Sequence, residues 1–208
     1  MTPEDRYGLL SAATRWSALS LAWAALVGVT SMVAGLAVSS VALVGFGLNS
    51  MLDGSASAVL VWRFRHERLG RAQVGAVEQR AALVVGGAMI GVALYLSASA
   101  ISALAGHSEP ERSTVGIVLT GASVFVFPVL ARAKLRLAGP VGSAALRGDG
   151  VLSLAGAVLA TATLTSLVLD AAFDWWWADA VAALFISAML LVEGSRTIAS
   201  ARTIASAP

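Results

Sequence analysis

Long apolar stretches separated by short polar segments dominate this chain. Between Arg15 and Arg63 a single residue, Asp53, carries a formal charge. Because a helix needs about 20 apolar residues to cross the hydrocarbon core of a bilayer, this run is long enough for two membrane spans. Lipid offers the backbone no hydrogen-bond partner, so the spans are predicted to be helices. The period-two alternation of transmembrane strands is not visible.

The same pattern recurs along the chain and predicts an all-α membrane protein with six transmembrane helices in a single transmembrane domain, residues 1–208. We expect the polar segment between the second and third spans, His66–Gln79, to leave the membrane. Pro128 is expected to kink the fourth span, and Gly139-Pro140 to break the chain before the fifth. No soluble C-terminal domain is expected. The predicted spans are approximately Trp16–Ala37, Val41–Trp62, Ala81–Gly106, Thr114–Ala131, Val141–Leu169 and Trp175–Val192.

Composition supports this class and argues against others. The chain is 58% hydrophobic and 12% charged, whereas soluble domains carry about 25% charged residues. The absence of cysteine excludes disulfides and thiolate metal sites. No concentrated basic region indicates a nucleic-acid partner. No nucleophile–base pair or phosphate-binding loop indicates an enzyme, and no tightly bound cofactor is expected.

The distribution of basic residues predicts how the chain is oriented. If the spans alternate in direction, 13 of the 14 Lys and Arg residues fall on one face, and the other face holds only Arg112. This count places Lys134 in the loop between the fourth and fifth spans. The positive-inside rule then puts both termini in the cytoplasm. The abundance of Ala, Gly and Arg is typical of GC-rich bacterial genomes and favours a multi-pass protein of the plasma (inner) membrane.

Asp53 is the strongest candidate for a functional residue. A carboxylate at mid-span costs at least ~2.5–3.5 kcal/mol on insertion scales, so it must face protein, water or a ligand. Asn49 lies one helical turn earlier on the same face. Hydrogen bonding of Asp53 for packing alone is the less favoured alternative. Small residues around the pair would let another helix approach closely; they are Gly45, Gly47, Ser50, Gly54, Ser55 and Ser57.

The fifth span offers a second carboxylate, Asp149, followed one turn later by Ser153. The second and fifth spans are predicted to be antiparallel. If Asp53 lies level with Asp149, then Asn49 lies level with Ser153. Two carboxylates, an amide and a hydroxyl suit a hard or borderline divalent cation, so these four residues are the predicted metal site. Alternatively, Asp149 is an interfacial carboxylate at the helix start, beside Arg147.

The remaining polar residues have simpler interpretations. Both histidines are interpreted as ordinary loop residues. Glu193 is expected to pair with Arg196 across one helical turn. Gly87-x-x-x-Gly91 in the third span is a candidate helix-packing face, although small residues are frequent throughout the chain.

Several stretches resemble a known family. The second span contains GFGLNSMLDGSASAVLVWRFR, residues 45–65, and the fifth begins with SAALRGDGVLSLAG, residues 143–156. With residues 78–81 and 177–181, they resemble the membrane domain of the cation diffusion facilitator (cation efflux) family. They are most similar to the branch that contains transmembrane protein 163, which binds and exports zinc. The resemblance implies a six-helix bundle that dimerises through its transmembrane helices.

The chain departs from the motifs of that family. The family's second span carries Asp-x-x-x-Asp, and the matching positions here are Asn49 and Asp53. Its fifth span carries His-x-x-x-Asp, and the matching positions are Leu152 and Gly156. Manganese-transporting relatives also have Asn at the first position. Asp149 and Ser153, water or a second subunit would therefore have to complete a metal site.

The sequence thus favours a transporter that exports zinc, or secondly manganese, by proton-coupled alternating access. Asp53 would bind the metal and exchange it for a proton. Two alternatives remain. One is a non-transporting membrane scaffold or partner protein that keeps the fold, and the other is an exporter of small organic cations that uses Asp53. The clustering of aromatic residues near the span ends argues mildly against the second.

Overall fold

The computed structural model describes residues 3–68, 75–107 and 111–205. These residues form helices and no strands, and each helix contains a segment long and apolar enough to cross a membrane. The predicted all-α fold with six spans is therefore confirmed. The helices are α1 (Pro3–Ala37), α2 (Val41–Arg68), α3 (Gly75–Gly106), α4 (Thr114–Val141), α5 (Ala144–Phe173) and α6 (Trp177–Ala205).

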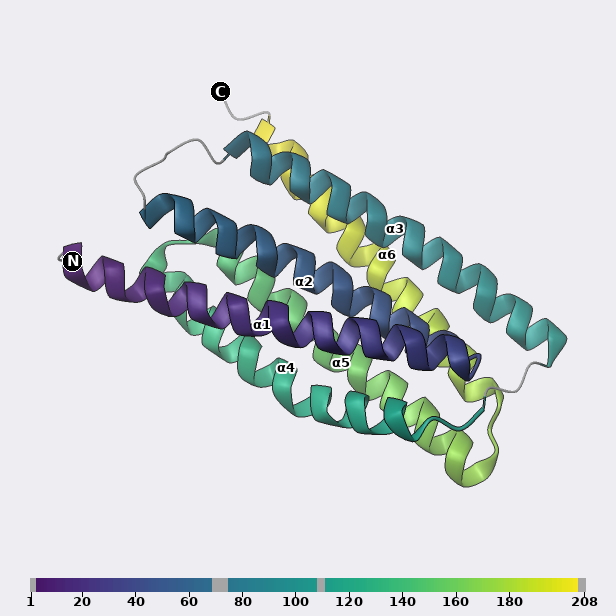
Figure 1. Cartoon of the computed structure of the whole chain (residues 1–208). Coiled ribbons are helices and arrows are strands. Elements are labelled where there is room, and N and C mark those ends of the chain that lie inside the picture. Colours follow the sequence, from purple (N-terminus) through teal and green to yellow (C-terminus); the bar gives the residue numbers. More distant parts are fainter. Residues whose placement is uncertain (1–2, 69–74, 108–110, 206–208) are drawn as a thin grey trace.

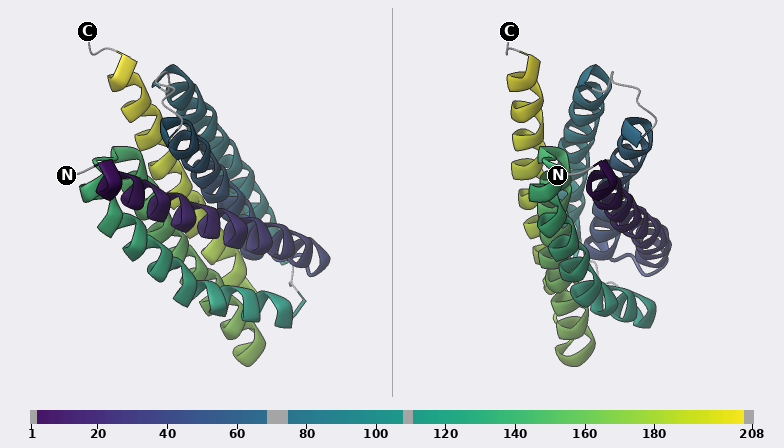
Figure 2. Two further views of the ribbon diagram at one scale, coloured as in Figure 1. Left: turned by 60° about the vertical axis from the view of Figure 1, so that its left-hand side comes forward. Right: turned by 90° about the vertical axis from the view of Figure 1, so that its left-hand side faces the viewer.

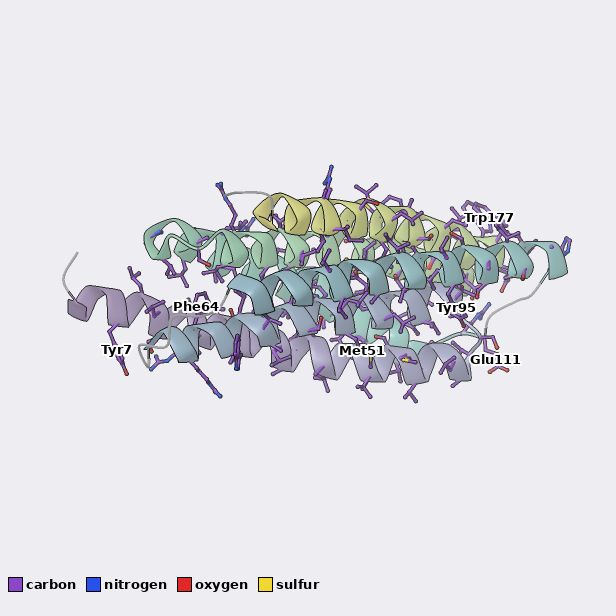
Figure 3. All side chains as sticks on the ribbon, turned by 90° about the horizontal axis from the view of Figure 1, so that it is seen from above. Tyr7, Met51, Phe64, Tyr95, Glu111 and Trp177 are labelled. Carbon is purple, nitrogen blue, oxygen red and sulfur yellow. The ribbon has the colours of Figure 1, made fainter. Side chains whose placement is uncertain are left out.

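The six helices run up and down in one bundle, with both termini at the same end (Figure 1). The most extensive contacts join α1 with α2, α3 with α6, and α4 with α5. The two views in Figure 2 show α3 and α6 side by side along their length. In Figure 3, Tyr7 lies at the end that holds the termini, and Glu111 and Trp177 lie at the other. Helix α2 contacts α1, α3, α5 and α6, so the span that carries Asp53 is at the centre of the bundle.

The predicted end of the fourth span at Ala131 and the predicted break at Gly139-Pro140 are both wrong. Helix α4 does not end at Ala131 but continues through Pro128 and Pro140 to Val141. The chain turns at Gly142, which has a left-handed φ of 70° and donates its N–H to the carbonyls of the last helical turn. Glycine adopts this conformation without a Cβ clash, and that conformation ends the helix. A proline in the last turn removes only one hydrogen bond, so Gly139-Pro140 does not break the chain.

The longer α4 also corrects the position of Lys134. The side chain is not in a loop but inside the helix, and it is completely buried. It therefore does not belong to the exposed basic residues at that end of the bundle. The segment His66–Gln79 lies partly outside the described residues, since α2 reaches Arg68 and α3 begins at Gly75.

Small residues bring the helices close together, as predicted for α2. A Cβ added to Gly47 would lie 2.9 Å from the carbonyl oxygen of Gly28, so α1 and α2 touch backbone to backbone. Gly86 and Gly194 make the same kind of contact between α3 and α6. The Gly87-x-x-x-Gly91 pair does not take part, because an added Cβ at either glycine would meet no described atom within 4 Å.

At the end of the bundle away from the termini, a carboxylate of α6 holds the start of α2. Asp179 accepts hydrogen bonds from the Ser40 hydroxyl and from the backbone N–H of Ala42, the latter at 3.1 Å. Asp179 is only 4% exposed. It therefore serves as a capping group for the free N–H groups in the first turn of α2, supplied by another helix.

Candidate functional site

Two polar clusters interrupt the apolar interior, and the first surrounds Lys134. The ammonium nitrogen of Lys134 lies 2.7 Å from Oδ2 of Asp149, and both side chains are almost completely buried. A buried ion pair needs further hydrogen bonds to offset the loss of hydration. The helices around it supply them.

Three serine hydroxyls complete the surroundings of the ammonium group. Lys134 Nζ donates to Oγ of Ser20 at 2.7 Å, of Ser153 at 3.0 Å and of Ser57 at 3.2 Å. Ser57 in turn donates to Oδ1 of Asp149 at 2.9 Å. Four oxygens from α1, α2 and α5 thus surround a cation that belongs to α4. Asp149 and Ser153, two of the four predicted metal ligands, are occupied by this internal cation.

These contacts correct the predicted alignment of the second and fifth spans. Asp149 lies level with Ser57, one helical turn beyond Asp53, and not with Asp53 itself. Asp149 lies in the second turn of α5 and is only 3% exposed, so its carboxylate faces the interior of the bundle. The register is set by packing: a Cβ added to Gly150 would come within 3.0 Å of the Leu135 side chain, so α5 lies tightly against α4.

The sequence alone does not connect Lys134 with Asp149. The loop assignment placed the lysine outside the membrane, and the ion pair depends on how far α4 extends. One signal was available, because Lys134 is the only lysine among the 14 basic residues of the chain. Its ammonium is a compact charge with three donors on a flexible stem, and the guanidinium of arginine does not reproduce that geometry.

The second cluster surrounds Asp53, which is 3% exposed. Neither carboxylate oxygen of Asp53 has a hydrogen-bond partner among the described residues. Asn49, 7% exposed, lies one turn away on α2. Both residues line a cavity of about 10 Å³, which has room for about one water molecule. Burying a carboxylate without hydrogen-bond partners costs free energy, so this cavity is the candidate ligand-binding site.

The rest of the cavity wall comes from α3, α5 and α6. The lining residues here include a second acid, Glu193, and two methionines, Met89 and Met189. Leu152 occupies one of the two ligand positions of the family motif and lines the cavity with an apolar side chain. Gly156, at the other position, packs against the ring of Phe127 instead. The remaining lining residues are Ala155, Leu159 and Leu190.

Glu193 forms the predicted pair with Arg196, with 3.1 Å between Oε1 and the guanidinium nitrogen. The Glu193 side chain is 18% exposed and that of Arg196 is 71% exposed. The sequence did not reveal that Glu193 shares a cavity with Asp53. The only available signal was that Met189 and Glu193 lie one turn apart on one helix face.

The side chains of the lining residues carry two carboxylates, an amide and two thioethers. Oxygen donors suit hard and borderline divalent cations. The described residues contain no group of three or more His, Cys, Asp or Glu side chains arranged to hold a metal ion. Asp53 also interacts electrostatically with both Lys134 and Asp149, so the two clusters influence each other.

Six helices long and apolar enough to cross a membrane pack around a buried carboxylate, and this arrangement defines a polytopic membrane protein. A family model described as the cation efflux transmembrane domain matches residues 17–204. The match includes most or all of every helix, and the chain therefore belongs to the cation efflux family, as the resemblance implied. Members of this family are transporters of metal cations. The chain is thus a multi-pass membrane protein with a cation-transport domain.

Proposed function

We propose that this protein exports a divalent metal cation, with zinc as the first candidate and manganese as the second, and that Asp53 and Asn49 bind it. The observation that supports this most is Asp53: it lines a cavity, and its two buried oxygens have no hydrogen-bond partner within the part of the chain that the structure describes. The resemblance to the branch of transmembrane protein 163 favours zinc. Asn49 in place of a carboxylate would weaken the preference and admit manganese.

The proposed mechanism is alternating access coupled to protons. The cavity would open to one side of the membrane and then to the other as the helices rock. On the outward side a proton would replace the metal on Asp53. Asp149 and Ser153 would join the cation only in a state in which Lys134 has moved away, because they hold its ammonium here. We also propose a homodimer in the plasma membrane with both termini in the cytoplasm.

Metal flux into proteoliposomes tests this function, with zinc and manganese measured in parallel. The variants are Asp53→Asn and, as a matched control, Asp174→Asn, which alters an exposed carboxylate paired with Arg112. We expect saturable flux in the wild type and in the control, and none in Asp53→Asn. No flux of either metal through correctly inserted wild-type protein would overturn the proposal.

That negative outcome would favour a scaffold or partner protein of the same fold. The specific observation behind this second candidate is the apolar character of the two fifth-span positions, Leu152 and Gly156. A scaffold should keep its interactions in Asp53→Asn. Export of organic cations is less well supported, because a cavity of about 10 Å³ is far smaller than the several hundred Å³ typical of small-molecule pockets.

A further inference from the structure

We propose that Glu193 is the second carboxylate of the Asp53 cation site, in the role that sequence analysis gave to Asp149. This inference rests on the proposed function and adds a ligand to it. Glu193 lies on α6, a helix that none of the four predicted ligands comes from. Among the described residues that line the cavity, Asp53 and Glu193 are the two acids.

The first argument is charge balance in the buried interior. Lys134 and Asp149 form a neutral pair, so Asp149 has no charge left for a second cation. Asp53 alone leaves one negative charge, which would not balance a divalent ion. Asp53 and Glu193 together supply two, and a buried cation is stable only when its charge is compensated.

The second argument is position. Asp53 and Asn49 reach the cavity from α2, and Glu193 reaches it from α6. Next to Glu193, Gly194 packs against Gly86 so closely that an added Cβ would lie 2.9 Å from its carbonyl oxygen. The α6 backbone is therefore fixed at this point, as a ligand position requires.

The thioethers of Met89 and Met189 complete this wall and bear on the choice of cation. Sulfur is a soft donor that magnesium and calcium do not favour, whereas zinc accepts mixed oxygen and sulfur ligation. A set of two carboxylates, an amide and neighbouring thioethers thus fits zinc better than it fits an alkaline-earth ion.

The third argument is that Glu193 is available. Its partner Arg196 is mostly exposed, and exposed ion pairs contribute little to stability. A cation that enters the cavity can therefore replace Arg196 at low cost. Arg196 then acts as a competitor for Glu193, so its removal should tighten cation binding. A purely structural pair would not behave in this way.

Zinc titration calorimetry on the detergent-solubilised full chain tests the inference with Glu193→Gln and Arg196→Gln. We expect Glu193→Gln to weaken zinc binding about tenfold or more, as loss of a ligand charge does. We expect Arg196→Gln to tighten zinc binding about twofold, because an ion pair within one helix contributes about that factor. The two variants thus shift affinity in opposite directions. Equal shifts, or no shift in Glu193→Gln, would overturn the inference.

Two further samples separate this inference from the proposed function. Glu111→Gln makes the same chemical change on an exposed side chain at the other end of the bundle, and it should bind zinc like the wild type. If the wild type binds zinc, Asp53→Asn abolishes binding and Glu193→Gln does not weaken it, the proposed function stands and the role of Glu193 is rejected. If the wild type binds no divalent cation, both are rejected.

Discussion

The Lys134 cluster and the Asp53 cavity are neighbours on α2, since Ser57 and Asp53 are one helical turn apart. In the first, the charged groups have partners from within the chain: an ion pair and three hydroxyls. In the second, a carboxylate of equal burial has none among the described residues. The difference is the presence of a tethered cation.

This comparison shows how one interior can use the same residue type in two ways. A lysine fixed by the backbone cannot leave, so its carboxylate serves the fold. A carboxylate without such a partner can be stabilised only by something that enters, and that partner can be exchanged. The predictions below separate the two roles.

The largest effect is expected from Lys134→Met, which leaves Asp149 as an uncompensated buried charge. Breaking a buried pair in this way costs about 3–5 kcal/mol of stability. Thermal unfolding in detergent measures it, and Lys134→Met combined with Asp149→Leu is the control. The double variant should recover most of the loss, because it removes both charges. Wild-type stability in the single variant would contradict a structural role for the pair.

The next effect concerns stabilisation by metal. Zinc at a hundred times its dissociation constant should stabilise the wild type by about 2.7 kcal/mol through mass action. In Asp53→Asn this gain should vanish, while stability without zinc should be unchanged or higher because an unpaired buried charge is gone. Asp149→Asn is the matched comparison and should be less stable with or without zinc. If Asp53→Asn and Asp149→Asn changed stability equally, with and without zinc, the two carboxylates would not have the different roles inferred here.

A smaller effect is expected from a ligand placed in the cavity wall. Leu152→His would put an imidazole beside Asp53 and should tighten zinc binding about tenfold, with a smaller gain for manganese. Competition titration of the two metals measures it. Gly156→Asp should give no gain, because Gly156 does not line the cavity and its Cβ direction leads to the ring of Phe127, at a normal contact distance of 3.5 Å. A gain in Gly156→Asp alone would contradict the observed cavity.

The smallest effect on zinc binding is expected far from both clusters, at Ser40. Ser40→Ala removes two hydrogen bonds, the one donated to Asp179 and the one accepted from the Leu43 N–H, and should lower stability by about 1–2 kcal/mol. Zinc affinity should not change, since Ser40 does not line the cavity. The same unfolding and titration measurements apply, and a loss of affinity would show that the end of the bundle controls the site.

Much of the fold follows from sequence because membrane energetics act on local features. The uncharged run around Asp53 is enough to predict two spans and to mark that residue, since its place near the middle of an apolar run is visible in the sequence. The close contact of Gly28 with Gly47 follows from the small side chains of the second span.

The predicted site was incomplete for a different reason. The relation of Asp149 to Ser57, and of Glu193 to Asp53, depends on the register and rotation of neighbouring helices. These are set by packing across the bundle, such as that of Gly150 against Leu135. Spacing within one helix carries no such information. Lys134 was missed because the end of α4 depends on Gly142, eleven residues beyond the predicted boundary at 131.

The hydrogen bonds that Asp179 accepts from Ser40 and Ala42 tie the start of α2 to α6 at that end of the bundle. Helices α2 and α6 both line the cavity, and these hydrogen bonds join them at one end only of the bundle's described length. Glu193 lies roughly 20 Å along α6 from Asp179, because a helix rises about 1.5 Å per residue. If α6 tilted by about 10° relative to α2 about this joint, Glu193 would move by roughly 3–4 Å, more than the diameter of one water molecule. A small rotation between α2 and α6 would therefore be enough to move the carboxylate of Glu193 away from that of Asp53.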